Sequence, residues 1–263
     1  MIESSLSIFF CMHTKEAFTP EFDTLFSEAK ITVIENGFDD GTTTNSERAY
    51  NKLSLGQLTL EQIRRNSKPD GEYTDLGFYQ GLQTRISKSG RTIVFEHSPL
   101  TNNDLERWAL ATKVLNTKKE FKTALPEYRR FLKLKAADER KRNDSLARQL
   151  QSLILLNSGK SILLVIGAGH ERPLRELGLS FTSHYMVTPM KIDIQSELMT
   201  RFELMEYVSD FELLQAMAEN FMHQAAGKSG NLPHAERVKV SEKVRNMSRE
   251  SLEKYVSEEL KRE

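Results

Sequence analysis

The sequence predicts an α/β fold, with a mixed, mainly parallel central sheet flanked by helices. Short apolar segments rich in β-branched and aromatic residues alternate with helical patterns, which is typical of βαβ units. The segments are continuously apolar, as in strands that helices cover on both faces. The predicted strands are Leu6–Met12, Ile31–Ile34, Thr92–Phe95, Ile162–Ile166 and, less clearly patterned, Ser180–Thr188.

Helices are predicted from their start signals and their apolar stripes. Thr19 before Pro20 is typical of an N-cap followed by proline in the first turn. Thr101 and Asp104 have the spacing of a capping box. The predicted helices are Pro20–Ala29, a helix that follows Thr101, a long helix from Asp138 that ends at Asn157-Ser158-Gly159, and helices from about Gln195 to Ala226.

The chain of 263 residues is long enough for one large α/β domain with an appendage. We expect this domain to span residues 1–226, with residues 46–89 as an inserted helical hairpin. Residues 227–233 have the composition of a linker, and residues 234–263 that of a charged helical tail. The apolar residues of this tail could pack on the body or form a homo-oligomer; they are Val240, Val244, Met247 and Tyr255.

Composition limits the partners of the chain. Lys and Arg total 37, as do Asp and Glu, so the formal net charge is zero and argues against nucleic acid as the main partner. The longest apolar run, Ile162–Ile166, is far shorter than the ~20 residues that a membrane span needs. The one cysteine, Cys11, excludes an internal disulfide. These features predict a soluble, cytoplasmic protein.

Each of the first four predicted strands ends at a histidine or a glutamate. In order along the chain these residues are His13, Glu35, Glu96 and His170. Because the carboxyl ends of parallel strands meet at one edge of a sheet, we expect the four side chains to lie close together. The sequence therefore predicts a polar site at this edge.

Two chemistries fit these residues. Imidazoles and carboxylates suit a divalent transition metal that activates water, with His13, His170, Glu35 and Glu96 as candidate ligands. Alternatively, a glutamate takes a proton without a metal while a histidine stabilises charge. Arg142, near the predicted start of the long helix, could pair with a glutamate or a substrate carboxylate.

These residues resemble motifs of the TraB/PrgY and Tiki proteins. The segment Ile162–Leu174 looks like their second Gly-x-x-His motif, at Gly167 and His170. About 20 residues upstream, the segment Glu139–Ala147 is similar to their arginine-led helix motif, at Arg142 and Asn143.

Further parts of the resemblance lie nearer the N-terminus. The segments that end at Glu35 and Glu96 are similar to the strand-end glutamates of the family. The segment Phe10–His13 keeps the histidine of the first motif, but Phe10 stands where the family has glycine. The resemblance covers roughly residues 13–188, in the order that the family has.

The resemblance implies a hydrolase of a peptide or of a small amide or ester. Tiki members imply a metal such as Mn²⁺, Co²⁺ or Zn²⁺, with His13, His170 and Glu35 or Glu96 as ligands or base. The wider superfamily of erythromycin esterase-like and ChaN-like proteins includes hydrolases that use histidine and glutamate without a required metal. ChaN-like members bind haem, the less favoured cofactor here.

Two alternatives to a hydrolase stay open. The predicted site could sequester a peptide or a haem without turnover, with His13 or His97 as the axial ligand of the haem. The chain could instead be a helical interaction protein that works through residues 234–263. Phe10 puts a large side chain where the family has glycine. This difference concerns the geometry of the predicted site, whichever function the site has.

Overall fold

The computed structural model describes residues 5–35, 76–86, 92–96, 99–188, 190–226 and 232–262. The fold is α/β, as predicted, with a parallel five-stranded sheet in the order β3-β2-β4-β1-β5. The strands are β1 Leu6–Cys11, β2 Ile31–Ile34, β3 Thr92–Phe95, β4 Ile162–Gly167 and β5 Thr182–Tyr185.

The strand pairing aligns the carboxyl ends of the first four strands. β4 lies between β1 and β2, and its Ile162 is opposite both Leu6 and Ile31. At the other end, Gly167 of β4 pairs with Cys11 of β1. All described pairs are parallel, so the residues that follow these strands emerge at one edge, as the sequence predicts.

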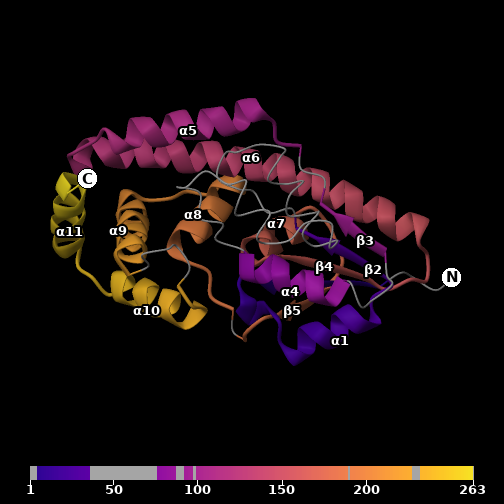
Figure 1. The fold of residues 1–263 in the computed structure, drawn as a ribbon. Helices are drawn as coiled ribbons and strands as arrows, with labels where there is room; N and C mark the ends of the chain where they lie inside the picture. The colour runs from indigo at the N-terminus through magenta and orange to yellow at the C-terminus, as the bar shows by residue number, and fades with distance from the viewer. Residues whose placement is uncertain are drawn as a thin grey trace, which may run out of the picture. The chain divides into compact units, whose positions relative to one another are not determined.

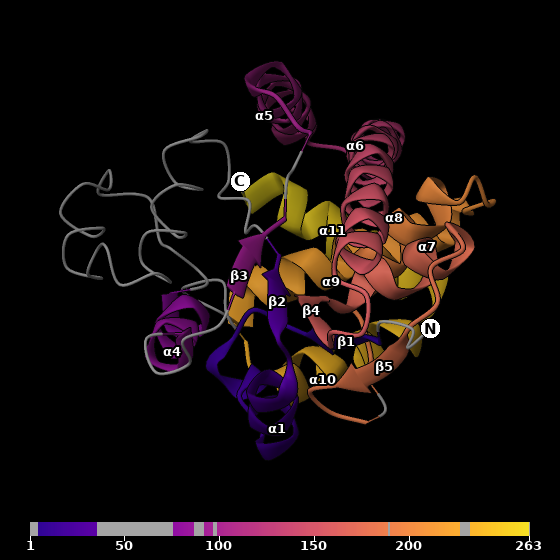
Figure 2. The same cartoon turned by 90° about the vertical axis from the view of Figure 1, so that its right-hand side faces the viewer.

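Helices cover both faces of the sheet, which explains the continuously apolar strands (Figure 2). On one face, α1 (Pro20–Glu28) and α4 (Leu76–Ile86) pack on Phe9 and its neighbours. On the other face, the C-terminal part of α6 (Phe121–Leu156) and α7 (Glu171–Glu176) pack on a second apolar cluster. That cluster includes Ile8, Phe10, Val33, Leu146, Leu150, Ile166 and Leu174.

The chain divides into two compact units. The sheet unit comprises Met1–Pro99 and Asn143–Met190, and the helical unit comprises Leu100–Arg142 and Lys191–Glu263. The predicted linker, residues 227–233, lies mostly outside the described residues. Of the predicted hairpin at 46–89, the structure describes only α4.

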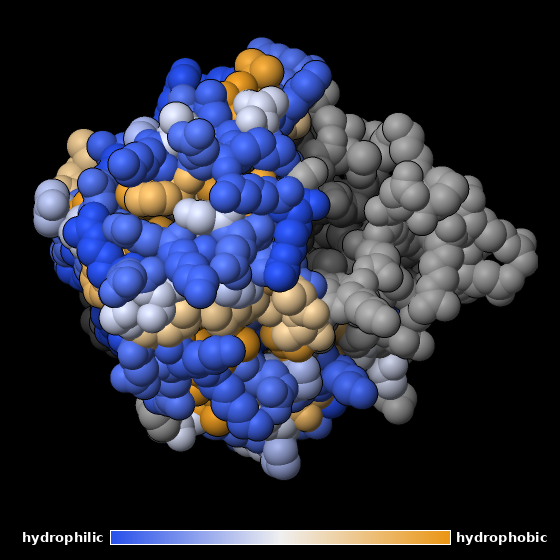
Figure 3. Space-filling model, turned by 90° about the vertical axis from the view of Figure 1, so that its left-hand side faces the viewer, coloured by the Kyte–Doolittle hydropathy of each residue, from blue (hydrophilic) through white to orange (hydrophobic). Residues whose placement is uncertain are grey.

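The described part of the helical unit is built of helices (Figure 1), and it has its own apolar core. The predicted tail forms α10 (His234–Arg245) and α11 (Arg249–Arg262), and its Val244 is buried in this core beside Leu213 and Leu214. The tail therefore packs its apolar residues within the chain, and a homo-oligomer stays a prediction. Figure 3 shows a mainly hydrophilic face, on which hydrophobic residues gather in small groups. The other helices are α5 (Asn102–Asn116), α8 (Ile194–Glu203) and α9 (Asp210–Ala226).

One helix differs in extent from the prediction. The long helix α6 begins at Phe121 instead of near Asp138, because buried residues such as Leu132 extend its apolar stripe toward the N-terminus. The predicted helices from about Gln195 to Ala226 are α8 and α9; α8 ends at Glu203, and Met205 after it adopts a left-handed φ of 61°.

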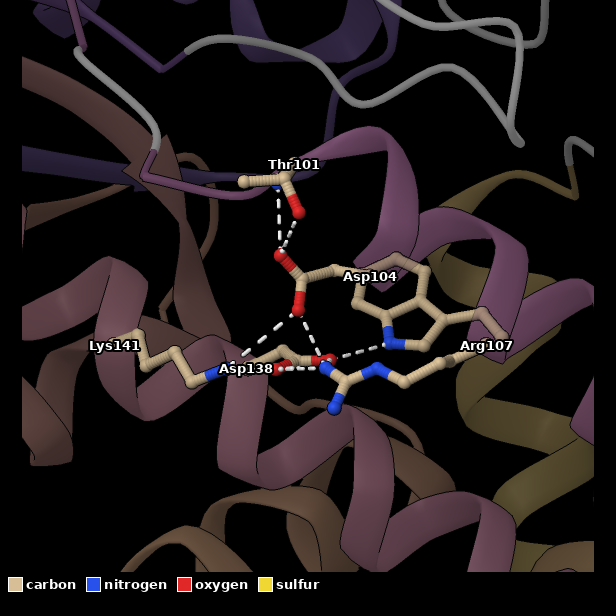
Figure 4. A network of polar contacts seen from close by, with 6 residues as sticks. Thr101, Asp104, Arg107, Asp138 and Lys141 are labelled. Atoms are coloured by element: carbon tan, nitrogen blue, oxygen red, sulfur yellow. Dashed lines mark hydrogen bonds and ion pairs between the residues drawn. The ribbon is translucent and has the colours of Figure 1, made fainter.

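A buried carboxylate joins α5 to α6 (Figure 4). Asp138 accepts hydrogen bonds from Trp108 Nε1 at 2.8 Å, Lys141 Nζ at 2.8 Å and Arg107 Nη2 at 3.1 Å. At the start of α5, the Thr101 N–H donates to Asp104 at 2.8 Å, which confirms the predicted capping interaction. These contacts hold α5 against α6 and cap the start of α5, so helix packing and capping explain them.

Candidate functional site

Glu35 is the centre of the candidate site. It directly follows β2, and its N–H continues the ladder by donating to Val165 O on β4 at 2.9 Å. Its side chain is 7% exposed, and Oε2 accepts the Gly167 N–H at 2.5 Å. The strand ladder and this hydrogen bond together fix the carboxylate at the edge of the sheet.

His13 approaches Glu35 from the end of β1, at the same edge of the sheet. It follows β1 in a tight turn, in which the Thr14 N–H donates to Met12 O at 2.7 Å, and the 3-10 helix Lys15–Ala17 comes next. Its Nε2 lies 3.0 Å from Glu35 Oε2, and the histidine side chain is 15% exposed. One carboxylate oxygen is thus close to both an imidazole and a backbone amide.

His170 lies on the other side of the carboxylate. It ends the 3-10 helix Ala168–His170 after β4, and its Nε2 is 3.4 Å from Glu35 Oε1. Its Nδ1 is 2.6 Å from Oδ1 of Asn143, a buried residue of α6. Both ring nitrogens of His170 therefore lie close to side-chain oxygen atoms. Asn143, His170, Glu35 and His13 therefore form one chain of polar contacts within the sheet unit.

Gly167 lies beside both Glu35 and His170. A Cβ atom at this position would lie 3.4 Å from Glu35 Oε2 and 3.7 Å from the His170 ring. These are ordinary van der Waals distances, so the contribution of Gly167 that the structure shows is its backbone amide, which donates to the carboxylate.

Phe10, which replaces the glycine of the first family motif, points its ring into the core. The ring is fully buried and stacks on Tyr185 at 5.7 Å, with Phe181 at 6.0 Å. It belongs to the apolar cluster of the α6 and α7 face. The bulk of Phe10 is therefore accommodated between strands and helices.

The remaining predicted residues, Glu96 and Arg142, are both buried. Glu96 directly follows β3, its carboxyl is buried, and its N–H donates to Ile34 O at 2.9 Å. Arg142 is buried in α6, where its Nη1 lies 3.4 Å from Glu139 Oε2. Pairing of Arg142 with Glu35 or Glu96 stays a prediction. His97 lies outside the described residues.

The grouping of donor atoms bears on the predicted metal. Within the described ranges of the chain, no three His, Cys, Asp or Glu side chains are grouped so that they could hold a metal ion. Glu35 lies between the two imidazoles, with Oε2 3.0 Å from His13 Nε2 and Oε1 3.4 Å from His170 Nε2. The predicted Mn²⁺, Co²⁺ or Zn²⁺ site stays a prediction from the sequence.

Three contributors to the site were not predicted as site residues. The Asn143 side chain, the Gly167 amide and the ring of Phe78, which stacks on His13 at 4.8 Å, all touch the polar chain. The family resemblance at Gly167 and Asn143 was the available signal for two of them. Nothing in the local sequence around Phe78 indicates its contact with His13.

A second polar site lies within the helical unit. Asp193, Glu219, His223 and Arg237 line a pocket of about 350 Å³. Burial lowers the pKa of His223, against the raising effect of Asp193. The groups are mixed in charge, and Arg237 Nη1 lies 3.9 Å from Asp193 Oδ2.

No known protein family, curated protein or solved structure matches the chain. The resemblance to TraB/PrgY and Tiki proteins therefore remains an interpretation of the motifs. None of the helices in the described ranges is long and apolar enough to cross a membrane.

Proposed function

We propose that the chain is a hydrolase of a peptide or of a small amide or ester, in which Glu35 activates water. One observation carries the proposal: His13 and His170 approach a single buried carboxylate from two strand ends. A structural carboxylate needs partners, but backbone amides or a lysine would suffice. Two imidazoles add groups that can take up, hold and return protons near neutral pH.

In the proposed reaction Glu35 takes a proton from water as the oxygen attacks the carbonyl carbon. The imidazolium of His170 stabilises the negative oxygen of the tetrahedral intermediate. The bond to the leaving nitrogen or oxygen then breaks, and the leaving group takes the proton back from Glu35. His13 holds the carboxylate in place during both steps, and Asn143 orients the ring of His170.

Glu96 and Arg142 have supporting roles in this proposal. Glu96 adds a second buried carboxyl at the end of the strand beside β2. Arg142 would orient a carboxylate of the substrate, since guanidinium binds carboxylates through two parallel hydrogen bonds. A bound metal would supply a different source of activated water, and the metal titration described in the Discussion tests for it.

The proposal includes membership of the TraB/PrgY–Tiki group and a cytoplasmic location. The motifs at His13, Glu35, Glu96, Arg142 and His170 support the membership. The presence of a single cysteine, Cys11, which excludes an internal disulfide, supports a reducing compartment.

The test is a hydrolysis screen with short peptides, small amides and small esters. Wild type is compared with His170→Gln and with a matched control, His184→Gln. His184 also pairs with a glutamate of the sheet unit, with Nδ1 2.9 Å from Glu21 Oε1, but Glu21 is exposed. Removing a group that stabilises developing charge lowers kcat by about 10²–10³.

The expected result is a hydrolytic activity that His170→Gln removes and His184→Gln retains. Equal activities in all three proteins would contradict the proposal. Binding of a peptide or of haem at His13 and His170 without turnover of any substrate would replace it with the sequestering function.

A further inference from the structure

A column of stacked groups stands behind His13. The His13 ring stacks on Phe78 with centroids 4.8 Å apart and planes 15° apart. Phe78 stacks in turn on Phe18, at 5.5 Å and 14°. The guanidinium of Arg85 closes the column, 4.1 Å above the Phe18 ring. Four groups from two segments of the sheet unit thus lie face to face.

The far end of the column is anchored by ion pairs. Arg85 Nε donates to Asp23 Oδ1 at 2.6 Å, and its Nη2 donates to Oδ2 at 3.1 Å. Its Nη1 also donates to Gly81 O at 3.2 Å. The column therefore runs from an anchored guanidinium on α4 to the imidazole beside Glu35.

Gly81 makes room for the column. A Cβ atom at this helical position would lie 2.1 Å from one ring atom of Phe18 and 2.6 Å from another. Glycine in a helix interior is unfavourable by about 1 kcal/mol relative to alanine, so close packing is the physical reason for it here. Phe78, three residues earlier on α4, is 1% exposed and has no room to turn away.

We propose that Phe78 is a positioning residue for His13. His13 lies in a turn between β1 and a 3-10 helix, outside the strand ladder. The face of a fixed aromatic ring restricts the imidazole to a nearly parallel plane, in which Nε2 lies 3.0 Å from Glu35 Oε2. The contact itself does not depend on the proposed function, but its catalytic consequence does.

The test measures how fast diethylpyrocarbonate modifies each histidine, read by peptide mass mapping in the full chain. Phe78→Leu keeps an apolar side chain but removes the ring. Gly81→Ala displaces the Phe18 ring and leaves both Phe78 and His13 unchanged in sequence. Phe26→Leu is the matched control, since this buried phenylalanine of the same apolar cluster stacks on Phe22.

The expected result is that His13 is modified about two- to tenfold faster in Phe78→Leu than in wild type. This factor is the change in the population of displaced His13 rings that the loss of one aromatic pair implies. Gly81→Ala should raise the rate by a smaller factor. Phe26→Leu should leave it at the wild-type value, and His184 in each sample reports any general unfolding. Phe78→Tyr should retain the slow rate, because it keeps the ring, even where its buried hydroxyl lowers Tm.

Equal rates for His13 in Phe78→Leu and Phe26→Leu would overturn the positioning role. A fast rate in Phe78→Tyr would overturn it as well. If the hydrolase proposal also holds, Phe78→Leu lowers kcat and leaves KM unchanged. If no substrate is hydrolysed, the modification rates still decide the role of Phe78, so the two proposals fail separately.

Discussion

Each unit of the chain contains a buried glutamate with several polar partners, Glu35 in one and Glu219 in the other, and the partners differ. Glu35 of the sheet unit lies near two imidazoles and accepts the Gly167 N–H. Glu219 of the helical unit is 1% exposed and accepts the N–H groups of Ile194 at 2.7 Å and Gln195 at 3.3 Å. Both carboxyls accept backbone N–H groups, and the carboxyl of Glu35 also lies 3.0 and 3.4 Å from the Nε2 atoms of two imidazoles.

The partners of Glu219 are those of a helix cap. Ile194 and Gln195 are the first residues of α8, whose N–H groups have no partner within the helix. The Ser241 hydroxyl of α10 donates to the other carboxyl oxygen. Glu219 thus joins α8, α9 and α10, a role that needs no proton transfer.

The comparison teaches that burial of a carboxyl does not by itself indicate a reactive site. The kind of partner distinguishes the two cases: backbone amides and a hydroxyl hold helices together, while imidazoles can also move protons. Four predictions test this difference, in order of decreasing effect.

The pH dependence of stability should come from Glu219. Burial, supported by the charge of Asp193 and opposed by the Ser241 hydrogen bond, raises the pKa of Glu219 from 4.5 to about 7. A raised pKa in the folded state means that stability is fully present below pH 4.5 and is lost as pH rises through about 7. The difference corresponds to about 3 kcal/mol of unfolding free energy.

Glu219→Gln should remove this dependence, because an amide keeps the shape and cannot ionise. The measurement is urea unfolding from pH 4.5 to pH 8, followed by fluorescence of Trp108. This residue is the one tryptophan of the chain and belongs to the helical unit. An equally steep loss of stability in wild type and Glu219→Gln would show that another group is responsible.

A metal titration should separate the two glutamates further, because Glu35 lies within 3.4 Å of two imidazoles, whereas backbone amides and a hydroxyl donate the hydrogen bonds of Glu219. If the sequence-based prediction of a metal is correct, Mn²⁺, Co²⁺ or Zn²⁺ at 100 times its Kd adds about 2.7 kcal/mol of stability. The measurement is thermal unfolding after chelation, with and without each ion. The increase should disappear in His170→Gln and persist in Glu219→Gln, and an increase that persists in His170→Gln would place the metal elsewhere.

Asn143 should affect turnover and not substrate affinity. Its Oδ1 lies 2.6 Å from His170 Nδ1, so Asn143→Ala frees the ring to turn. Loss of such an orienting partner typically lowers activity by about 10–100-fold. Steady-state kinetics on the best substrate of the screen measures kcat and KM separately, and an unchanged kcat would remove Asn143 from the site.

The smallest effect is expected for a third histidine–glutamate pair, His184 with Glu21. Because Glu21 is exposed, the pair should contribute no more than about 1 kcal/mol to stability. Urea unfolding of His184→Gln measures this contribution. A larger loss would mean that a histidine–glutamate pair stabilises the chain strongly even without burial. Proximity alone would then explain much of the stabilisation that the contacts of Glu35 provide.

The fold and the convergence of the strand ends could be predicted from sequence, because both follow from local patterns. Continuously apolar strands that alternate with helices indicate a parallel sheet, and parallel strands carry His13, Glu35 and His170 to one edge. The start of α6 was predicted too far along the chain. Its buried positions before Asp138, such as Tyr128 and Leu132, can be identified only from the tertiary packing.

The finer contacts of the site could not be predicted. The stacking of Phe78 on His13 joins residues 65 positions apart, and no local spacing indicates such a pair. The family resemblance marks Gly167, but not the hydrogen bond from its amide to Glu35, since a backbone donor has no signature in the side-chain pattern. Glu219 was missed because its role depends on three helices that meet only in the folded helical unit.

The most direct test of the central claim compares Glu35→Gln with Glu219→Gln in the same hydrolysis assay. Both substitutions neutralise a buried carboxyl and keep its shape. We predict that kcat/KM falls by about 10²–10⁴ in Glu35→Gln, the usual contribution of a general base, and is unchanged in Glu219→Gln at pH 6. Equal activity in the two variants would contradict the assignment of Glu35 as the reactive carboxylate.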